Sequence, residues 1–182
     1  VSVVAGVGGG TVGVAGSVGV TVLTVHTYAS IGGSSVVAAG GDLAVLAVDD
    51  TRLVLIQASI AGGYVGVGAA VGVAVVSKDV QAFTGANGNL TAGGNGTGLS
   101  GIRNGNVVGA GFGTLGAFHG LAIQADSTED IVGVTASVGG GFVGIAGGVS
   151  VTLITVTVKA LLGANTTVDA SNVNVAATDR AK

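Results

Sequence analysis

Acidic residues recur at one place in a repeated pattern, and of all the side chains in this sequence they are the best suited to chemistry. Asp126, Glu129 and Asp130 lie in the segment DSTED, and Asp49 and Asp50 lie in a related segment, DDTR. Carboxylates stacked from adjacent repeats are candidate ligands for calcium. Neither an EF-hand loop nor a G-G-x-G-x-D nonapeptide is present, so a solvated corner of the repeat is the simpler interpretation. We therefore expect no cofactor and no resident metal, with calcium as the alternative.

Two kinds of hydrolytic chemistry need to be considered. His26 and His119 are the two histidines, but no nucleophile-elbow motif accompanies them as a Ser–His–Asp site would suggest. Asp42, Asp49 and Asp126, together with Asp50, could line one face as paired carboxylates for glycoside hydrolysis. Aromatic residues make up only 3% of the chain, which leaves little to hold a sugar ring. We expect no enzyme and no catalytic residue, and a polysaccharide-active β-helix enzyme is the alternative.

The composition is far from that of an ordinary enzyme. The 182 residues include 37 Gly and no Pro, Cys, Met or Trp, with 48% hydrophobic and 8% charged residues. Six basic residues are scattered along the chain, and no basic stripe is available to neutralise phosphates, so we expect no nucleic-acid partner. The absence of Cys excludes disulfides and thiolate metal sites. We interpret residues 1–182 as one domain and, since the chain opens on Val1 in an apolar pattern, as a segment of a longer protein.

The elements that would position these side chains follow a period of two. Residues 65–76 read VGVGAAVGVAVV, and similar stretches occur at 12–23 and 143–154. Large β-branched residues at every second position indicate strands with one buried face. The uncharged runs 53–76 and 131–158 are long enough for membrane helices, and they contain small-xxx-small spacings. Strict β-branched alternation with Gly nevertheless favours strands.

Three internal repeats cover residues 5–57, 58–135 and 136–182. The copies begin at Ala5, Ala58 and Ala136, so the second spacing is about one and a half times the first. Both spacings are near whole multiples of one unit of about 26 residues. The sequence thus predicts an all-β, parallel β-solenoid with about seven coils of about 26 residues. The additional material near 94–118 is either an extra coil or a protruding insert. We favour the coil because Val107, Val108, Phe112, Leu115 and Phe118 need burial.

The second repeat unit carries a family resemblance. Residues 28–51 read YASIGGSSVVAAGGDLAVLAVDDT, which resembles the repeats of filamentous haemagglutinin-like and leukotoxin-like bacterial exoproteins of two-partner secretion. The resemblance implies a right-handed parallel β-helix, export with an outer-membrane secretion partner, and location at the bacterial cell surface. It implies a structural or adhesive stalk that mediates attachment to a surface receptor or glycan, or cell–cell contact. A self-assembling extracellular filament subunit is the alternative, since no polar capping helix is evident at either end.

The small residues between the valines form the candidate binding surface. We expect them to point away from a buried valine ladder and to make a flat, weakly polar face. Such a face suits close packing against neighbouring coils or another copy of the protein. The alternative is that it is buried in the same molecule, beneath the insert. The residues are Gly13, Gly19, Gly66, Gly68, Gly72, Ala74, Gly144, Ala146 and Ser150.

Overall fold

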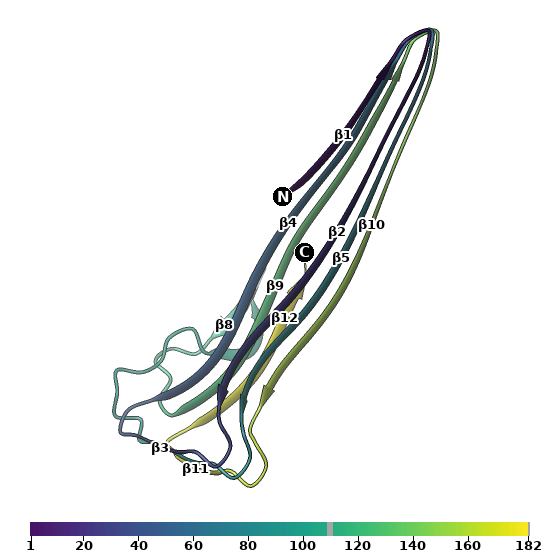
Figure 1. The fold of residues 1–182 in the computed structure, drawn as a ribbon. Helices are drawn as coiled ribbons and strands as arrows, with labels where there is room; N and C mark the ends of the chain where they lie inside the picture. The colour runs from purple at the N-terminus through teal and green to yellow at the C-terminus, as the bar shows by residue number, and fades with distance from the viewer. Residues whose placement is uncertain (109–110, 182) are drawn as a thin grey trace.

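The protein is an elongated, flattened wedge built from stacked parallel strands (Figure 1). The computed structural model describes residues 1–108 and 111–181, and these residues contain twelve strands and no helix. Two sheets of long strands face each other. A third sheet of short strands closes the wide end, and tight turns join the long sheets at the narrow end (Figure 1).

The strands of each sheet come from successive repeats. In the first, called here the β4 sheet, the order is β1 (Ser2–Gly9), β4 (Leu43–Gly62), β9 (Leu121–Gly140) and β12 (Val173–Ala181). In the second, the β5 sheet, the order is β10 (Val143–Leu161), β5 (Val65–Thr84) and β2 (Val12–Ile31). The short sheet contains β11 (Thr167–Ala170), β6 (Asn89–Ala92) and β3 (Val36–Ala39). Every pairing in these three sheets is parallel, which confirms the predicted all-β parallel solenoid.

The coil is about twice as long as the sequence analysis suggested. Val12 pairs with Val65, and Val65 pairs with Val143, so each step between neighbouring strands is one whole repeat of the sequence. One coil therefore contains a long strand of each sheet and one short strand, and β1 precedes three such coils. The expectation of about seven coils, each of about 26 residues, is wrong. A strand such as β5 already has 20 residues, so a closed coil with two long strands needs about two of the predicted units.

The additional residues of the second coil form an insert. Within 94–118, β7 (Arg103–Val108) and β8 (Gly111–Thr114) pair as an antiparallel hairpin, and Leu99 bridges Phe118. The segment leaves the stack beside the β4 sheet (Figure 1). The favoured extra coil is therefore wrong, and the protruding insert is correct. The expected burial is achieved only in part, because Leu115 and Phe118 pack with Ile102 against the sheet whereas Val108 is 64% exposed.

The two faces of the long strands are reversed relative to the prediction. In the narrow half, Gly13 and Gly66 point into the molecule, whereas Val14 and Val18 point outward and are each 68% exposed. The reason is the closeness of the two sheets. A Cβ atom added to Gly13 would lie 2.2 Å from the carbonyl oxygen of Gly62. Only the small residues fit between the sheets, so the valines must face outward.

The wedge shape follows the size of the inward side chains. Along β5 these residues are Gly66 and Gly68 near the narrow end, and then Val76 and Val80 towards the wide end. Because side-chain volume sets how closely two sheets pack, the sheets separate gradually. The main core lies at the wide end, where the buried cluster comprises Val45, Ala47, Val80, Ala82, Leu90, Ala92, Leu121, Ile123 and Ala125.

The turns at the narrow end depend on glycine. Gly10, Gly63 and Gly141 have φ values of 140°, 155° and 137°. A Cβ atom at Gly63 would lie 2.0 Å from the oxygen of Gly10, so the turns stack only as glycine. The next residues, Tyr64 and Phe142, stack with their ring centroids 5.3 Å apart.

Candidate functional site

A buried group of charged residues, called here the ion cluster, lies between the two long sheets. It consists of Lys78 of β5, Asp49 of β4 and Glu129 of β9, all pointing inward. Lys78 Nζ lies 2.6 Å from Glu129 Oε1, contacts Asp49 Oδ1, and donates to the backbone oxygen of Thr128 at 3.3 Å. These three acceptors match the three donors of an ammonium group. The cluster joins strands of both sheets at the middle of their length.

Hydroxyl groups complete the shell around the carboxylates. Thr27 and Thr51 donate to Asp49 at 3.2 and 2.9 Å, and Ser127 donates to Glu129 at 2.5 Å. Although burial raises the pKa of Asp49, the hydrogen bonds from Lys78 and Thr51 outweigh burial and hold that pKa below its usual value. Asp49 is therefore a carboxylate at neutral pH and a partner for the lysine.

Asp179 extends the cluster at the open end of the stack, on β12. Partial burial raises its pKa first, and the negative charge of Glu129 raises it further. Glu129 Oε2 is buried and has no hydrogen-bond partner within the described chain. Three carboxyl groups thus lie near one lysine, which forms ion pairs with Asp49 and Glu129. The negative charge of Asp179 is in excess and is unfavourable.

The position of these acids corrects the sequence interpretation. Residues 49–52 pair with residues 127–130, so the polar segment recurs, but Asp49 pairs with Ser127 and no acid of β4 pairs with an acid of β9. The acids lie within strands, and Asp49, Glu129 and Asp179 point inward, so the expectation of a solvated corner is wrong. Within residues 1–108 and 111–181, no group of three or more potential ligands is arranged to hold a metal ion. The ammonium group of Lys78 occupies the centre of the cluster, where a calcium ion would have to lie.

The insert is held to the outer face of the β4 sheet by a second polar group. Arg103 Nε lies 2.8 Å from Asp126 Oδ2, and the Arg103 amide donates to Gln124 Oε1 at 2.8 Å. Asn174 of β12 donates to the Arg103 backbone oxygen at 3.1 Å. The insert thereby covers Ala122, Gln124 and Asp126, which would otherwise be the outward residues of β9.

The structure separates the two histidines. His26 points outward from β2, beside Tyr28, whose hydroxyl donates to Asp79 at 2.5 Å. This hydrogen bond raises the pKa of Tyr28 and lowers that of Asp79, to which Gln81 also donates. His119 lies before β9, with Nδ1 3.7 Å from Asp42 Oδ1. No serine hydroxyl forms a hydrogen bond with either ring in the described part of the chain.

The four acids considered for glycoside hydrolysis are not gathered at one place. Asp42 accepts from the Gly120 amide at a corner, and Asp49 belongs to the ion cluster. Asp50 is on the outer face, and Asp126 is engaged by Arg103 under the insert. No pocket opens among the residues that the structure describes.

The nine residues of the expected packing face lie on the inward side of the β5 sheet. Gly13, Gly19, Gly66, Gly68, Gly72 and Ala74 are buried against the β4 sheet of the same chain. Gly144, Ala146 and Ser150 point the same way from β10, the last strand of the stack, and stay exposed at its open end. The placement of this face on the outside is wrong, because only small residues fit between the sheets at this end.

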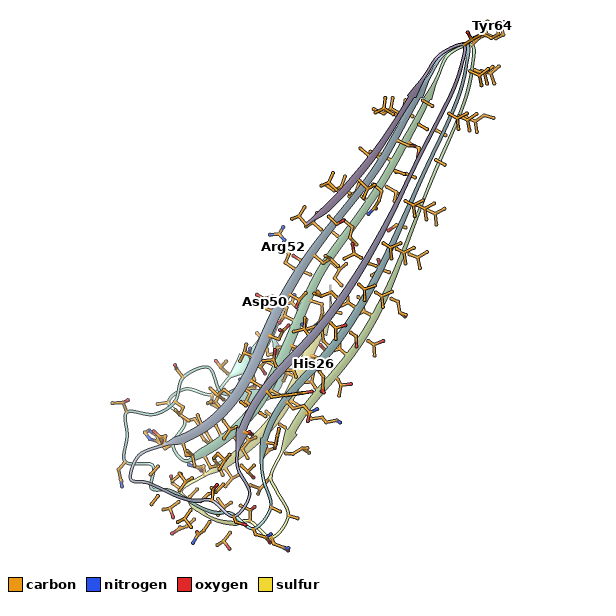
Figure 2. All side chains as sticks on the ribbon, in the orientation of Figure 1. His26, Asp50, Arg52 and Tyr64 are labelled. Carbon is orange, nitrogen blue, oxygen red and sulfur yellow. The ribbon has the colours of Figure 1, made fainter. Side chains whose placement is uncertain are left out.

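The surface that the sequence reasoning missed is the opposite one, called here the valine face. It consists of the outward residues in the narrow half of the β5 sheet, and it carries no charged or polar side chain. Its large members are Val12, Val14, Val18, Val20, Val22, Val65, Val67, Val71, Val73, Val75, Val143, Ile145, Val149, Val151 and Leu153. The labelled polar residues Arg52, Asp50 and His26 lie in the part of the molecule away from the narrow end that Tyr64 marks (Figure 2).

Signals for both missed features are present in the sequence. Val76, Lys78 and Val80 occupy alternate positions of one strand and therefore point to the same face. If the valines point inward, the lysine must do so as well. The valine face is signalled by glycine runs at the turns, which imply backbones in close approach.

Comparison with protein-family models, with curated proteins and with solved structures finds no match to this chain. No membrane-spanning helix is found in residues 1–108 and 111–181.

Proposed function

We propose that the chain is a structural segment of a β-solenoid stalk in a secreted bacterial surface protein, where it supports attachment to surfaces or to other cells. The observation that carries the proposal is that the stack ends on unpaired strands on both sides. Within the described chain, β2 and β10 each pair on one side only, and so do the short strands β3 and β11. Unpaired parallel strands of this length are templates for further coils.

The ladders support continuation in the same register. Val12, Val65 and Val143 occupy one position in three coils, and the same holds along the whole of β10, from Val143 to Leu161. An added coil with the same alternation would pair along the whole edge. The resemblance of residues 28–51 to filamentous adhesin repeats supports the surface role.

The long coil determines what such a stalk does well. A whole coil, such as residues 12–64, lengthens the stack by only about 4.8 Å, the usual spacing between strands. A solenoid of this kind gains little length per residue but presents two wide lateral faces. It is therefore better suited to making contacts through those faces than to spanning a long distance.

A tandem chain tests the stalk proposal. By register, Val1 corresponds to Val54 and Ala181 to Thr51, so a continuous stack needs two residues between Ala181 of one copy and Val1 of the next. Lys182 supplies the first by sequence, and a single Leu, in the place of Leu53, supplies the second. Two copies joined by this Leu should form one continuous stack, with one cooperative thermal transition at a higher midpoint than the single chain.

The control tandem carries a two-residue Leu-Ser linker. This linker should break the register, since a slip of one residue turns every side chain to the other face. We expect its midpoint to stay close to that of the single chain. Equal midpoints for both tandems and the single chain would contradict the proposal.

A second candidate function, a self-assembling filament subunit, is favoured by one further observation. β12 and the first half of β4 both pair with residues 121–129 of β9, so copies stacked end to end would place β12 of one copy beside β4 of the next. Arg180 would then face Asp50 of the next copy, a complementary pair on the outer side.

Charge exchange tests the filament. Arg180→Glu and Asp50→Arg should each shorten the rods seen by electron microscopy, and the double variant should restore them. The same junction brings Asp179 beside Asp49 of the next copy, and the two carboxylates repel each other. Asp179→Asn removes this repulsion and should lengthen the rods. Particles of fixed length in all four variants would exclude assembly through these ends.

A further inference from the structure

The valine face carries fifteen large aliphatic side chains, and no part of the described chain covers it. Val73 and Val75 are half-buried only by their own neighbours on adjacent strands, while Val20 on β2 remains 66% exposed. The core at the wide end does not use these residues, and neither does the ion cluster. Monomeric proteins seldom expose a contiguous aliphatic surface of this kind to water. Its presence therefore indicates an interaction site.

The chemistry of the face restricts what can bind it. It offers no hydrogen-bond donor or acceptor from a side chain, and it extends over three parallel strands. A partner must therefore be aliphatic and must match the relief of these three strands. A second copy of the same face meets both conditions, and a lipid bilayer is the other occupant that the test must distinguish.

The relief of the face supports a specific pairing. On β5 the outward residues run from Val65 to Val75, with the small Ala69 next to the midpoint at residue 70. In the adjacent coils the same position is Gly16 and Gly147, so a shallow groove crosses all three strands. The ridge of Val71 and its ladder partners lies on the other side of the midpoint.

We infer that two copies of the chain pair through their valine faces, with their strands antiparallel. In this arrangement Ala69 faces Val71 of the second copy, and Val67 faces Val73, so each ridge fills a groove. Parallel pairing would instead place groove on groove and leave a void, which close-packed interfaces avoid. Antiparallel pairing also directs the two wide, charged ends away from each other.

The size of the face sets the expected strength. Three strands about 4.8 Å apart, with an apolar stretch of about ten residues, give a face of roughly 15 by 35 Å. A pair would bury on the order of 1,000 Å² in total, near the lower end for specific complexes. We therefore expect a weak, concentration-dependent dimer for this chain, and a stronger association for a stack with more coils.

Sedimentation equilibrium of the whole chain, at micromolar concentrations, tests the pairing. Val73→Lys should weaken dimerisation more than about a hundredfold, because it buries an unpaired charge at the centre of the interface. Gln81→Lys is the matched control, on the same strand and the same outer side but in the polar half, and it should leave the dissociation constant unchanged. Circular dichroism checks that both variants keep the parent fold. Equal effects of the two variants would overturn the proposal.

A groove-filling variant separates specific pairing from general stickiness. Ala69→Ile enlarges the apolar surface, so unspecific association would become stronger. Ridge-in-groove pairing would become weaker by roughly tenfold to a hundredfold, because the new side chain collides with the Val71 ridge of the second copy. Stronger association of Ala69→Ile would overturn the proposal.

A lipid arm completes the test. Co-sedimentation with phosphatidylcholine vesicles by a chain that stays monomeric would also overturn the pairing and assign the face to lipid. Stalk continuation depends on the strand edges, so neither this result nor the behaviour of the Ala69 variant would affect the tandem-chain test.

Discussion

Lys78 Nζ lies 2.6 Å from Glu129 Oε1, and both side chains are fully buried although they are 51 residues apart in sequence. The pair joins the β5 sheet to the β4 sheet at the height where small inward residues give way to large ones. Because Asp49 contacts the same Nζ atom, one cation holds strands from two coils together.

Replacement of the lysine should be severely destabilising. Lys78→Met leaves Asp49 and Glu129 buried without a cation, and we expect it to lower the free energy of unfolding by about 3–5 kcal/mol. The control is Arg52→Gln, which removes the exposed Arg52–Asp130 pair, 3.6 Å long, and should cost less than about 1 kcal/mol. Urea denaturation at pH 7 measures both changes. Similar losses for the two variants would show that the ion cluster does not hold the sheets together.

Asp179 should have the opposite effect on stability to Asp49. Because its pKa is raised in the folded state, folding favours the protonated form, and stability falls as the pH rises from about 4 through the raised value. Asp179→Asn should therefore be more stable than the parent at pH 7 and equal to it below about pH 4. The pKa of Asp49 is lowered, so its contribution is present above about pH 4 and is lost in acid, and Asp49→Asn should destabilise at pH 7. Urea titrations from pH 3 to 7 test both signs, and a destabilised Asp179→Asn variant at pH 7 would contradict this account.

Two nearby glycines on β2 should respond differently to alanine. A Cβ atom at Gly13 meets the Gly62 oxygen at 2.2 Å, so Gly13→Ala must push the two sheets apart and should cost about 2 kcal/mol or more. Gly16 points outward with nothing within 4 Å, and Gly16→Ala should be neutral or stabilising by up to about 1 kcal/mol. Thermal unfolding at concentrations where the chain is monomeric distinguishes them. Equal tolerance at both positions would mean that the glycine face is not the inner one.

A buried amide offers a stabilising change. Gln57 is fully buried, and neither Nε2 nor Oε1 forms a hydrogen bond within the described chain. Since an unsatisfied buried polar group costs about 1–3 kcal/mol, Gln57→Met should raise the free energy of unfolding by about 1 kcal/mol. Gln81→Met, which removes a satisfied hydrogen bond to Asp79, is the control and should bring no gain. A loss of stability in Gln57→Met would indicate that the amide is hydrogen-bonded, for instance through a buried water.

The sequence was sufficient to predict the type of architecture but not its dimensions. Alternation around Val65 and Val143 predicted strands, and the copies predicted parallel stacking. The spacing of Ala5, Ala58 and Ala136 fits a short coil of about 26 residues, and it fits equally well a coil of twice that length with an insert. One indication was available, since the segments that form β2 and β4 do not resemble each other as two successive short repeats should.

The inward face was assigned wrongly for a physical reason. The usual rule places Val14 inside and Gly13 outside, because burial of large aliphatic groups drives folding. In this chain the tight turns at Gly10 and Gly63 bring the backbones together before a valine could fit. The burial of Lys78 among acids depends on that same inversion and was missed, although the recurrence of the acids themselves was predicted.

The pairing of Val12 with Val65 and of Val65 with Val143 also determines how the chain folds. Strands in the three parallel sheets join residues that are a whole coil apart in sequence, so stable pairing requires the closure of a large loop. Chains dominated by such distant contacts fold slowly, over milliseconds to seconds or longer. Once one coil has closed, its edge is a ready template for the next, so the first coil should set the folding rate.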